Sequence, residues 1–418
     1  MASTPQSSAA RPWFGLVMLT LVYILNFLDR QILSILAVPI KAEFHLSDAQ
    51  MGWLGGLAFG LFYSILAIPA ARLADRALRV GVMAAALALW SGFTALCGLT
   101  GGFISLFIAR LGVGVGEAGG VAPAYSLISD YFPPRMRARA MALYSLGIPI
   151  GIAAGAFIGG LLASDWRRAF IWVGLAGLVV TAPFLLLVKE PARQKPASAM
   201  PSLAGVAADA FSRPSFWLIS IGAGSASLVG YGLMFWLPAY LVRSAGFDLL
   251  HASRFIAGVT LIGGVAGMLL GGALADRLGG ARKGAYALIP AIAFVLSAGF
   301  YVLAVMVKAP SYAFWLFVIP QALGLMWFGP LLTAVQHLGP PAARSQVSAL
   351  FLLILNLIGL GLGPYAFGKL SDLLTPAFGT EALKYAFLAG LGFYILAAIL
   401  LTIAAGRLAR DWAKDGSD

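Results

Sequence analysis

Long apolar runs, separated by short polar or glycine-containing gaps, recur along the whole chain. A helix that crosses the ~30 Å hydrocarbon core of a bilayer needs ~20 mostly apolar residues, and these runs reach that length with few or no charges. The pattern predicts an all-α integral membrane protein with twelve transmembrane helices. The expected spans are approximately residues 13–40, 51–71, 80–99, 103–129, 140–163, 169–188, 215–242, 255–275, 284–307, 311–336, 345–368 and 385–406.

Two of these spans need a separate argument. The first run begins near Pro12 and is longer than the ~7–15-residue apolar core of a signal peptide, so we expect it to be retained as the first span. The third and fourth spans are separated only by Thr100, Gly101 and Gly102, which carry no charge. Paired glycines are typical of turns, so we predict a tight turn there.

Composition excludes a water-soluble protein. The chain of 418 residues is 61% hydrophobic and 11% charged, whereas an average soluble domain is roughly 45–50% apolar and 25% charged. The net charge of +12 comes from basic residues in the short gaps, without a basic face of the kind that binds nucleic acid. Because lysine and arginine are more frequent in the loops on one side, we expect both termini in the cytoplasm. Compact loops favour a bacterial inner-membrane protein.

Two short motifs occur once in each half of the chain. Residues 71–76 (ARLADR) recur as residues 272–277 (GALADR), and residues 133–137 (PPRMR) recur as residues 340–344 (PPAAR). A segment rich in Ala, Ser and Pro lies between the halves, which is the composition of a linker. We predict two pseudo-symmetric six-helix bundles, as in many secondary transporters. The predicted domains are residues 1–188, a cytoplasmic linker 189–214, and residues 215–418 with a short cytoplasmic tail.

The repeated motif resembles the signature of the major facilitator superfamily between its second and third helices, G-x-L-A-D-R-x-G-R-K. The second copy has both glycines, whereas the first has Ala71 and Leu78 in their place. In the superfamily this loop latches the cytoplasmic side, which implies a gate role here; the alternative is that these residues only set topology. The implied gate residues are Asp75, Arg76, Arg79, Asp276 and Arg277.

Further motifs are similar to the Spinster-like branch of that superfamily. They are residues 25–30 (LNFLDR) and residues 112–118 (GVGVGEA). Spinster-like relatives imply a lysophospholipid or sphingosine-phosphate substrate and proton coupling. Organic-anion symporters of the same superfamily share similar patterns, so a proton-coupled organic-anion transporter stays the alternative.

Four charged residues lie well inside the apolar spans, all in the first half: Asp29, Arg30, Arg110 and Glu117. Four uncompensated charges in a bilayer would cost on the order of 10 kcal/mol, so they must pair or face water. Helix rise places Asp29 and Arg110 at similar depth, with Glu117 nearer the middle and too far from Arg110 for direct contact. We hypothesise that Asp29, Arg110 and Glu117 form a proton-coupling network; the alternative is a static ion network that fixes helix packing.

The spans of the second half carry no charge. A cavity with one charged and one apolar wall suits an amphipathic anion, whose head would lie near an arginine and whose tail would lie among aromatic rings. The predicted substrate-binding residues are Asn26, Arg30, Tyr231, Phe235, Gln321, Trp327 and Asn356.

Glycines recur at four-residue spacing in the fifth and eighth spans, and such stripes allow another helix to approach closely. The resemblance implies that these two helices meet across the halves, where the stripes would form a smooth surface for rocking; the alternative is that the glycines serve helix packing alone. The glycines are Gly147, Gly151, Gly155 and Gly159, and Gly263, Gly267 and Gly271.

Other chemistry finds little support in the sequence. His45, His251 and His337 each have no second ligand at metal-binding spacing, so we expect no metal site. A phosphate-binding loop is absent from the sequence, so we expect no cofactor and a proton gradient as the energy source. We expect a monomer that binds a small-molecule or lipid substrate and membrane lipids, and no nucleic acid. An intramembrane lipid-modifying enzyme, a channel or a scramblase are the rivals from other classes.

Overall fold

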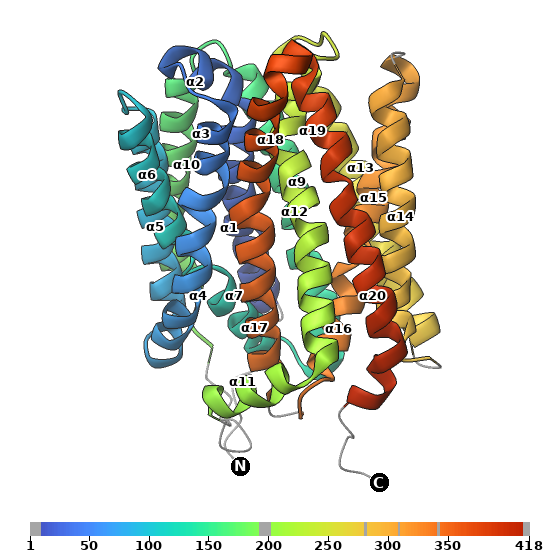
Figure 1. Ribbon diagram of the computed structural model, residues 1–418. Coiled ribbons are helices and arrows are strands. Elements are labelled where there is room, and N and C mark those ends of the chain that lie inside the picture. The colour runs from blue at the N-terminus through green and yellow to red at the C-terminus, as the bar shows by residue number, and fades with distance from the viewer. Residues whose placement is uncertain (1–9, 192–201, 280–281, 308–309, 341–342, 413–418) are drawn as a thin grey trace, which may run out of the picture.

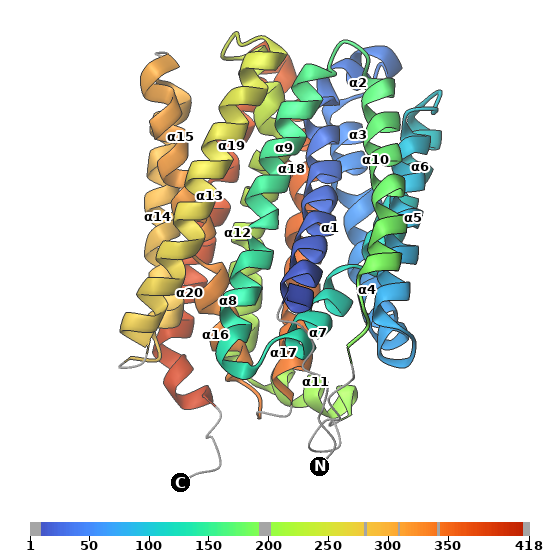
Figure 2. The same cartoon turned by 180° about the vertical axis from the view of Figure 1, so that it is seen from behind.

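The computed structural model describes residues 10–191, 202–279, 282–307, 310–340 and 343–412. These residues are 88% helical and include no strand. The long helices run side by side along one direction (Figure 1). Helix α1 begins, and helix α20 ends, at the end of the molecule where the short helix α11 lies, as the two opposite views show (Figures 1 and 2).

The N-terminal half contains ten α-helices and one π-helical segment among the described residues. They are α1 (Ala10–Ile35), α2 (Ala37–Phe44), α3 (Asp48–Gly52), η1 (Trp53–Leu57, π), α4 (Ala58–Arg76), α5 (Arg79–Cys97), α6 (Phe103–Glu117), α7 (Val121–Tyr131), α8 (Pro134–Ser145), α9 (Gly147–Leu161) and α10 (Trp166–Leu187). The turn predicted at residues 100–102 is confirmed, because α5 ends before it and α6 begins directly after it.

The rest of the described chain is also helical, with a second π-helical segment and a short 3-10 turn. Its elements are α11 (Leu203–Ser212), α12 (Pro214–Arg243), α13 (Leu249–Gly279), α14 (Ala285–Met306), α15 (Pro310–Leu325), α16 (Phe328–Gln336), α17 (Arg344–Asn356), η3 (Leu357–Gly361, π), α18 (Leu362–Phe378), η4 (Gly379–Glu381), α19 (Ala382–Gly390) and α20 (Gly392–Asp411).

Eleven stretches of the described chain are long and apolar enough to cross a membrane. The last of them, Arg344–Asp411, contains 68 residues. A straight helix of that length would measure about 100 Å, more than three times the ~30 Å hydrocarbon core. The stretch instead reverses near Gly379, which has a φ of 55° that favours glycine. Helices α18 and α20 accordingly run in opposite directions (Figure 1).

Two predicted segments contain features that the sequence did not predict. The fourth expected span is interrupted between Glu117, the last residue of α6, and Val121, the first of α7. The predicted linker contains α11, because the side chain of Ser202 accepts a hydrogen bond from the Gly205 amide and caps the helix.

The glycine stripes do not form the surface between the halves, so the rocking-surface prediction is wrong and the packing alternative holds. A Cβ atom on Gly151 would lie 2.5 Å from the carbonyl oxygen of Ile24 in α1, and one on Gly263 would lie 2.8 Å from that of Val318 in α15. The stripes therefore hold α1 and α15 against α9 and α13 inside each half. Helices α9 and α13 do meet, but Gly160 and Ser253 are among their contacts.

The two π-helical segments lie against each other where the halves meet. A Cβ atom on Gly56 would be 2.6 Å from the carbonyl oxygen of Gly361. The backbones of η1 and η3 thus approach too closely for any side chain, which joins the two halves tightly at this level.

Candidate functional site

Helix α1 places Asp29 in the interior of the N-terminal half, where it is 2% exposed. Its carboxylate pairs with Arg110 of α6 at 3.4 Å, and the Thr94 hydroxyl of α5 donates a hydrogen bond to the other oxygen. Three helices therefore supply one buried acid, its cation and a neutral donor. A buried charge is tolerated when it is both paired and hydrogen-bonded, and this arrangement satisfies both conditions.

The next residue of α1, Arg30, pairs with a different acid. Its Nε and Nη2 atoms each lie 2.8 Å from Oε2 of Glu117, which is fully buried at the end of α6. The guanidinium also lies over three aromatic rings, with its carbon 4.6 Å from the ring centre of Phe59 and 4.7 Å from that of Tyr63. Desolvated contacts between a guanidinium and a ring are attractive, so the rings help to hold Arg30 in place.

Phe59 separates the two ion pairs. Its ring lies 4.6 Å from the guanidinium carbon of Arg30 and 5.6 Å from that of Arg110. The four charges sum to zero, but Glu117 and Arg110 each have a buried atom, Oε1 and Nε, without a hydrogen-bond partner among the described residues. Since an unsatisfied buried polar atom is costly, Glu117 Oε1 is the place where a proton or a donor group would be best accepted, and Arg110 Nε is the place that would best donate to a polar ligand.

A small cavity lies beside these arginines, between the two halves. Its volume is about 20 Å³, and its lining includes Arg30, Arg110 and Phe59 from the N-terminal half and Tyr231 and Phe235 from α12. That volume is enough for about one water molecule. The arginines line the cavity while their acidic partners do not, so an anion entering from this side would meet the guanidinium groups first.

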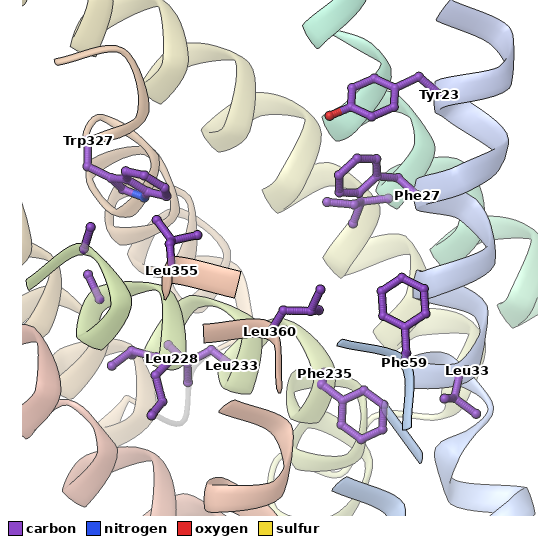
Figure 3. Packing of buried hydrophobic residues seen from close by; sticks show 14 of the residues in the cluster. Tyr23, Phe27, Leu33, Phe59, Leu228, Leu233, Phe235, Trp327, Leu355 and Leu360 are labelled. Atoms are coloured by element: carbon purple, nitrogen blue, oxygen red, sulfur yellow. The ribbon is translucent and has the colours of Figure 1, made fainter. Parts of the chain in front are cut away.

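The predicted substrate-binding residues divide into two groups. Tyr231 and Phe235 line the cavity, and Asn26 is buried in α1 with Oδ1 unpaired among the described residues. Figure 3 shows Phe235 next to Phe59, with Trp327 on the far side of the cluster near Leu355.

The other group lies away from the cavity, elsewhere in the C-terminal half. Gln321 accepts a hydrogen bond from Tyr301 at 3.3 Å, and Trp327 is 8% exposed and packs edge-on against Phe328. Asn356 directly precedes the π-helical segment η3. None of these three residues lines the small cavity.

A second buried cluster, which the sequence did not predict, joins the halves at the end of the molecule opposite α11. Asp48, the first residue of α3, is 2% exposed and accepts hydrogen bonds from Arg243 of α12 at 2.9 Å, from Ser371 of α18 at 2.8 Å and from Lys41. Asp372 in turn accepts the backbone amides of Asp48 and Ala49 at 2.9 and 2.8 Å. We call Asp48, Lys41, Arg243, Ser371 and Asp372 the outer cluster.

Comparison with known proteins places this helical arrangement in a family. The family model of the Major Facilitator Superfamily matches residues 19–364. The chain belongs to this superfamily. It is 34% identical to an MFS-type efflux pump of Mycolicibacterium smegmatis over 96% of this chain and 94% of that protein.

The resemblance to the Spinster-like branch of the superfamily is also confirmed. The chain is 28% identical to protein spinster homolog 1 of Xenopus tropicalis over 92% of this chain and 80% of that protein. It matches the crystal structure of a bacterial homologue of the human lysosomal transporter Spinster, in an inward-facing and unoccupied conformation, with a TM-score of 0.88 and 29% identity. That match covers 99% of this chain and 100% of that chain.

The superfamily loop motif carries the predicted gate residues. Arg79 is buried, and it donates hydrogen bonds to Asp130 at 2.5 Å and to Glu190 at 2.7 Å. Both acids belong to the N-terminal half or to the start of the linker, so these contacts tie α5 to α7 and to the chain after α10. The other gate residues with described side chains, Arg76, Asp276 and Arg277, are exposed; the side chain of Asp75 lies outside the described part of the structure.

Proposed function

We propose that this superfamily member is a proton-coupled secondary transporter that moves an amphipathic anionic lipid of the lysophospholipid or sphingosine-phosphate type. It would cross a bacterial inner membrane twelve times, with both termini in the cytoplasm, and act as a monomer. The observation that carries the proposal is the pair of buried acids behind Arg30 and Arg110, which line the cavity between the halves. Tyr231 and Phe235 offer the opposite, aromatic wall for the lipid tail.

The coupling step follows from the two ion pairs. Glu117 is held by Arg30 through one oxygen while its other oxygen has no partner among the described residues. Binding of a proton to Glu117 removes its negative charge and weakens its hold on Arg30. The freed guanidinium can then bind an anionic head group in the cavity. Proton and substrate would thus occupy the site together, as a symporter requires.

Arg110 keeps its partner Asp29 in this scheme, while Arg30 changes partners. Arg110 is bound to Asp29 and is the more deeply buried of the two arginines, at 1% exposure. The exchange therefore falls on Arg30, which is 8% exposed and one residue away from Asp29. Protonation of Glu117 would break the Arg30–Glu117 pair and change the total charge near Asp29. The protonation states of the two acids would therefore be linked.

Alternating access requires the outer cluster to open. It is built from α2 and α3 of the first half and from α12 and α18 of the second. Rocking of the halves would break the contacts of Asp48 with Arg243 and of Asp372 with α3, and it would open the cavity on the side opposite α11.

Uptake into proteoliposomes tests the proposal. Lysophospholipids and small organic anions are offered with and without an imposed pH gradient, in both directions. The wild type is expected to respond to the gradient, and Glu117→Gln is expected to keep counterflow exchange but to lose that response. An undiminished response in Glu117→Gln would exclude the coupling role. Flux without saturation or counterflow would indicate a channel or scramblase instead.

A proton-coupled transporter of small organic anions is the second candidate. The observation in its favour is the presence of two guanidinium groups, Arg30 and Arg110, in the lining of the cavity. Such a site suits a compact carboxylate, because arginine binds carboxylates through two parallel hydrogen bonds. The same uptake screen separates the two, since only the lipid transporter would prefer substrates with a long acyl chain.

A further inference from the structure

An apolar groove on the outside of the N-terminal half is separate from the cavity between the halves. Its volume is about 510 Å³, and it lies between α4, α5 and α6, with Leu73, Ala85 and Gly119 among its lining residues. Pockets of this size commonly hold small molecules. Its walls belong to spanning helices, so a molecule in the groove would lie at membrane depth.

The groove is about as long as one leaflet of a bilayer. Along α5 it runs from Gly81 to Leu89, which is eight residues or about 12 Å of helix. One leaflet contributes about half of the ~30 Å hydrocarbon core. One end of the groove is at Gly116, beside Glu117 and toward the middle of the span, and the other is at Leu78, where α4 has just ended. An acyl chain of one leaflet therefore fits its length.

Close packing of the backbone keeps the floor of the groove open. A Cβ atom on Gly116 would lie 2.6 Å from the backbone nitrogen of Trp90, and one on Gly119 would lie 2.9 Å from the Cβ atom of Ala86. No side chain of this protein can fill these positions without moving α5. The hollow is thus fixed by the way α6 packs on α5.

Two exposed arginines stand at the end of the groove near Leu78. Arg72 and Arg76 are one turn apart on α4, and Arg76 is three residues from the groove residue Leu73. Residues three or four apart are neighbours on a helix surface. An apolar groove of leaflet length with two cations at one end is complementary to a molecule with an acyl chain and a negatively charged head.

We propose that this groove binds one acyl chain of an anionic phospholipid, with the phosphate on Arg72 and Arg76. The lipid is a resident of the membrane and not the transported substrate. Its chain would support the end of α6, which carries Glu117, from the side opposite Arg30.

Native mass spectrometry of the full chain in detergent tests this proposal. Phosphatidylglycerol and phosphatidylcholine with the same chains are titrated against the wild type and three variants. Ala85→Phe fills the groove from an exposed position, and Ala176→Phe adds the same ring at an exposed position of α10 as the matched control. The double variant Arg72→Gln/Arg76→Gln removes the charges only.

Each arginine near a membrane surface is worth roughly a fivefold gain in affinity for an anionic lipid. The double variant should therefore lose roughly 25-fold in the preference for phosphatidylglycerol, and Ala85→Phe should lose the tightest binding event for both lipids. Ala176→Phe should bind like the wild type. Equal binding by Ala85→Phe and the wild type would overturn the proposal.

Two further outcomes would also count against it. A dimer that forms in the wild type and is lost in Ala85→Phe would mean that a second copy of the chain covers the groove. Equal binding of the two lipids to the wild type would remove the role of the arginines. Thermal unfolding and size exclusion check that each variant is folded, and the arginine variant, altered only on the surface, decides the charge argument alone. Lipid binding is measured without transport, so a negative result would overturn the groove proposal and leave the proposed function untouched.

Discussion

Replacing Arg243 with alanine should shift the protein toward a state that is open on the side opposite α11. Arg243 contacts both carboxylate oxygens of Asp48 at 2.9 Å, and the side chain of Asp48 is 3% exposed. A hydrogen bond to a charged group contributes about 1.5–3 kcal/mol. Because Lys41 and Ser371 would still hold Asp48, we take the lower part of that range, about 2 kcal/mol. This corresponds to a change of roughly 30-fold in the ratio of closed to open molecules.

Distance measurements between spin labels can detect this change. Ala42 in α2 and Ala245 after α12 are exposed and lie in different halves on this side of the molecule, so cysteines there can carry the labels. The only native cysteine, Cys97, is buried. We expect the wild type to give mainly a short distance and Arg243→Ala to give a larger fraction of a long one.

The matched control is Arg167→Ala. Arg167 pairs with Glu43 at 2.6 Å near the same end of the molecule, but both residues belong to the N-terminal half. Losing that pair should leave the distance distribution unchanged. The reasoning is refuted if Arg243→Ala gives the wild-type distribution, or if Arg167→Ala shifts it equally.

Three further results are expected. Arg30→Lys keeps the positive charge but loses the planar two-nitrogen contact, so the apparent affinity for substrate in uptake assays should fall by roughly tenfold; unchanged affinity would argue against Arg30 as the head-group ligand. Gly151→Ala should lower the free energy of unfolding by about 1–3 kcal/mol, because its Cβ atom would collide with α1. Gly299→Ala is the control: its Cβ atom would meet no atom within 4 Å, so it should be neutral or slightly stabilising. Equal losses in the two variants would contradict the packing account. Hydrogen bonds from Arg167 and Trp166 lower the pKa of Glu43, so the stability that this carboxylate contributes should be present at neutral pH and be lost as the pH falls below about 4.3 and through the lowered pKa. The difference in Tm between the wild type and Glu43→Gln should therefore shrink in acid, and a constant difference would count against this pair.

Much of the helical arrangement could be predicted, because the length of each apolar run shows directly whether a helix can cross the membrane. The turn before Phe103 and the charges of α1 and α6 followed from the same count. The sequence did not show which acid pairs with which arginine. Asp29 and Arg30 are adjacent, so their side chains leave the helix about 100° apart, and which neighbour each one reaches depends on how α1 is rotated against α5 and α6.

The prediction that the glycine stripes form a rocking surface was wrong for a related reason. Spacing shows that some helix can approach closely, but it does not say which one. Gly151 faces α1 within its own half, while the cross-half contact of α9 uses Gly160. A periodic pattern has no information about the identity of its partner.

The outer cluster could not be predicted from hydropathy, because its charges lie outside the apolar spans. Asp48 and Asp372 lie at or beyond the expected ends of spans, where charges are normally solvated. Asp48 becomes buried where the two halves meet. One usable signal was present, since Ser47 and Gln50 form a capping box that marks a helix start at Asp48.

The distribution of the buried charges also has a consequence for how the protein is made. The buried charges of α1, Asp29 and Arg30, sum to zero, and so do those of α6, yet the partners are 81 and 87 residues apart in the chain. At a synthesis rate of ~5–20 residues per second, α6 follows α1 after roughly 4–17 s. During that interval Asp29 and Arg30 have no partner from α6, and each unpaired charge costs ~2.5–3.5 kcal/mol in lipid. The first helix should therefore stay beside the membrane-insertion machinery until the fourth span is synthesised. Ribosome-bound chains that end before α6 should crosslink to that machinery through α1.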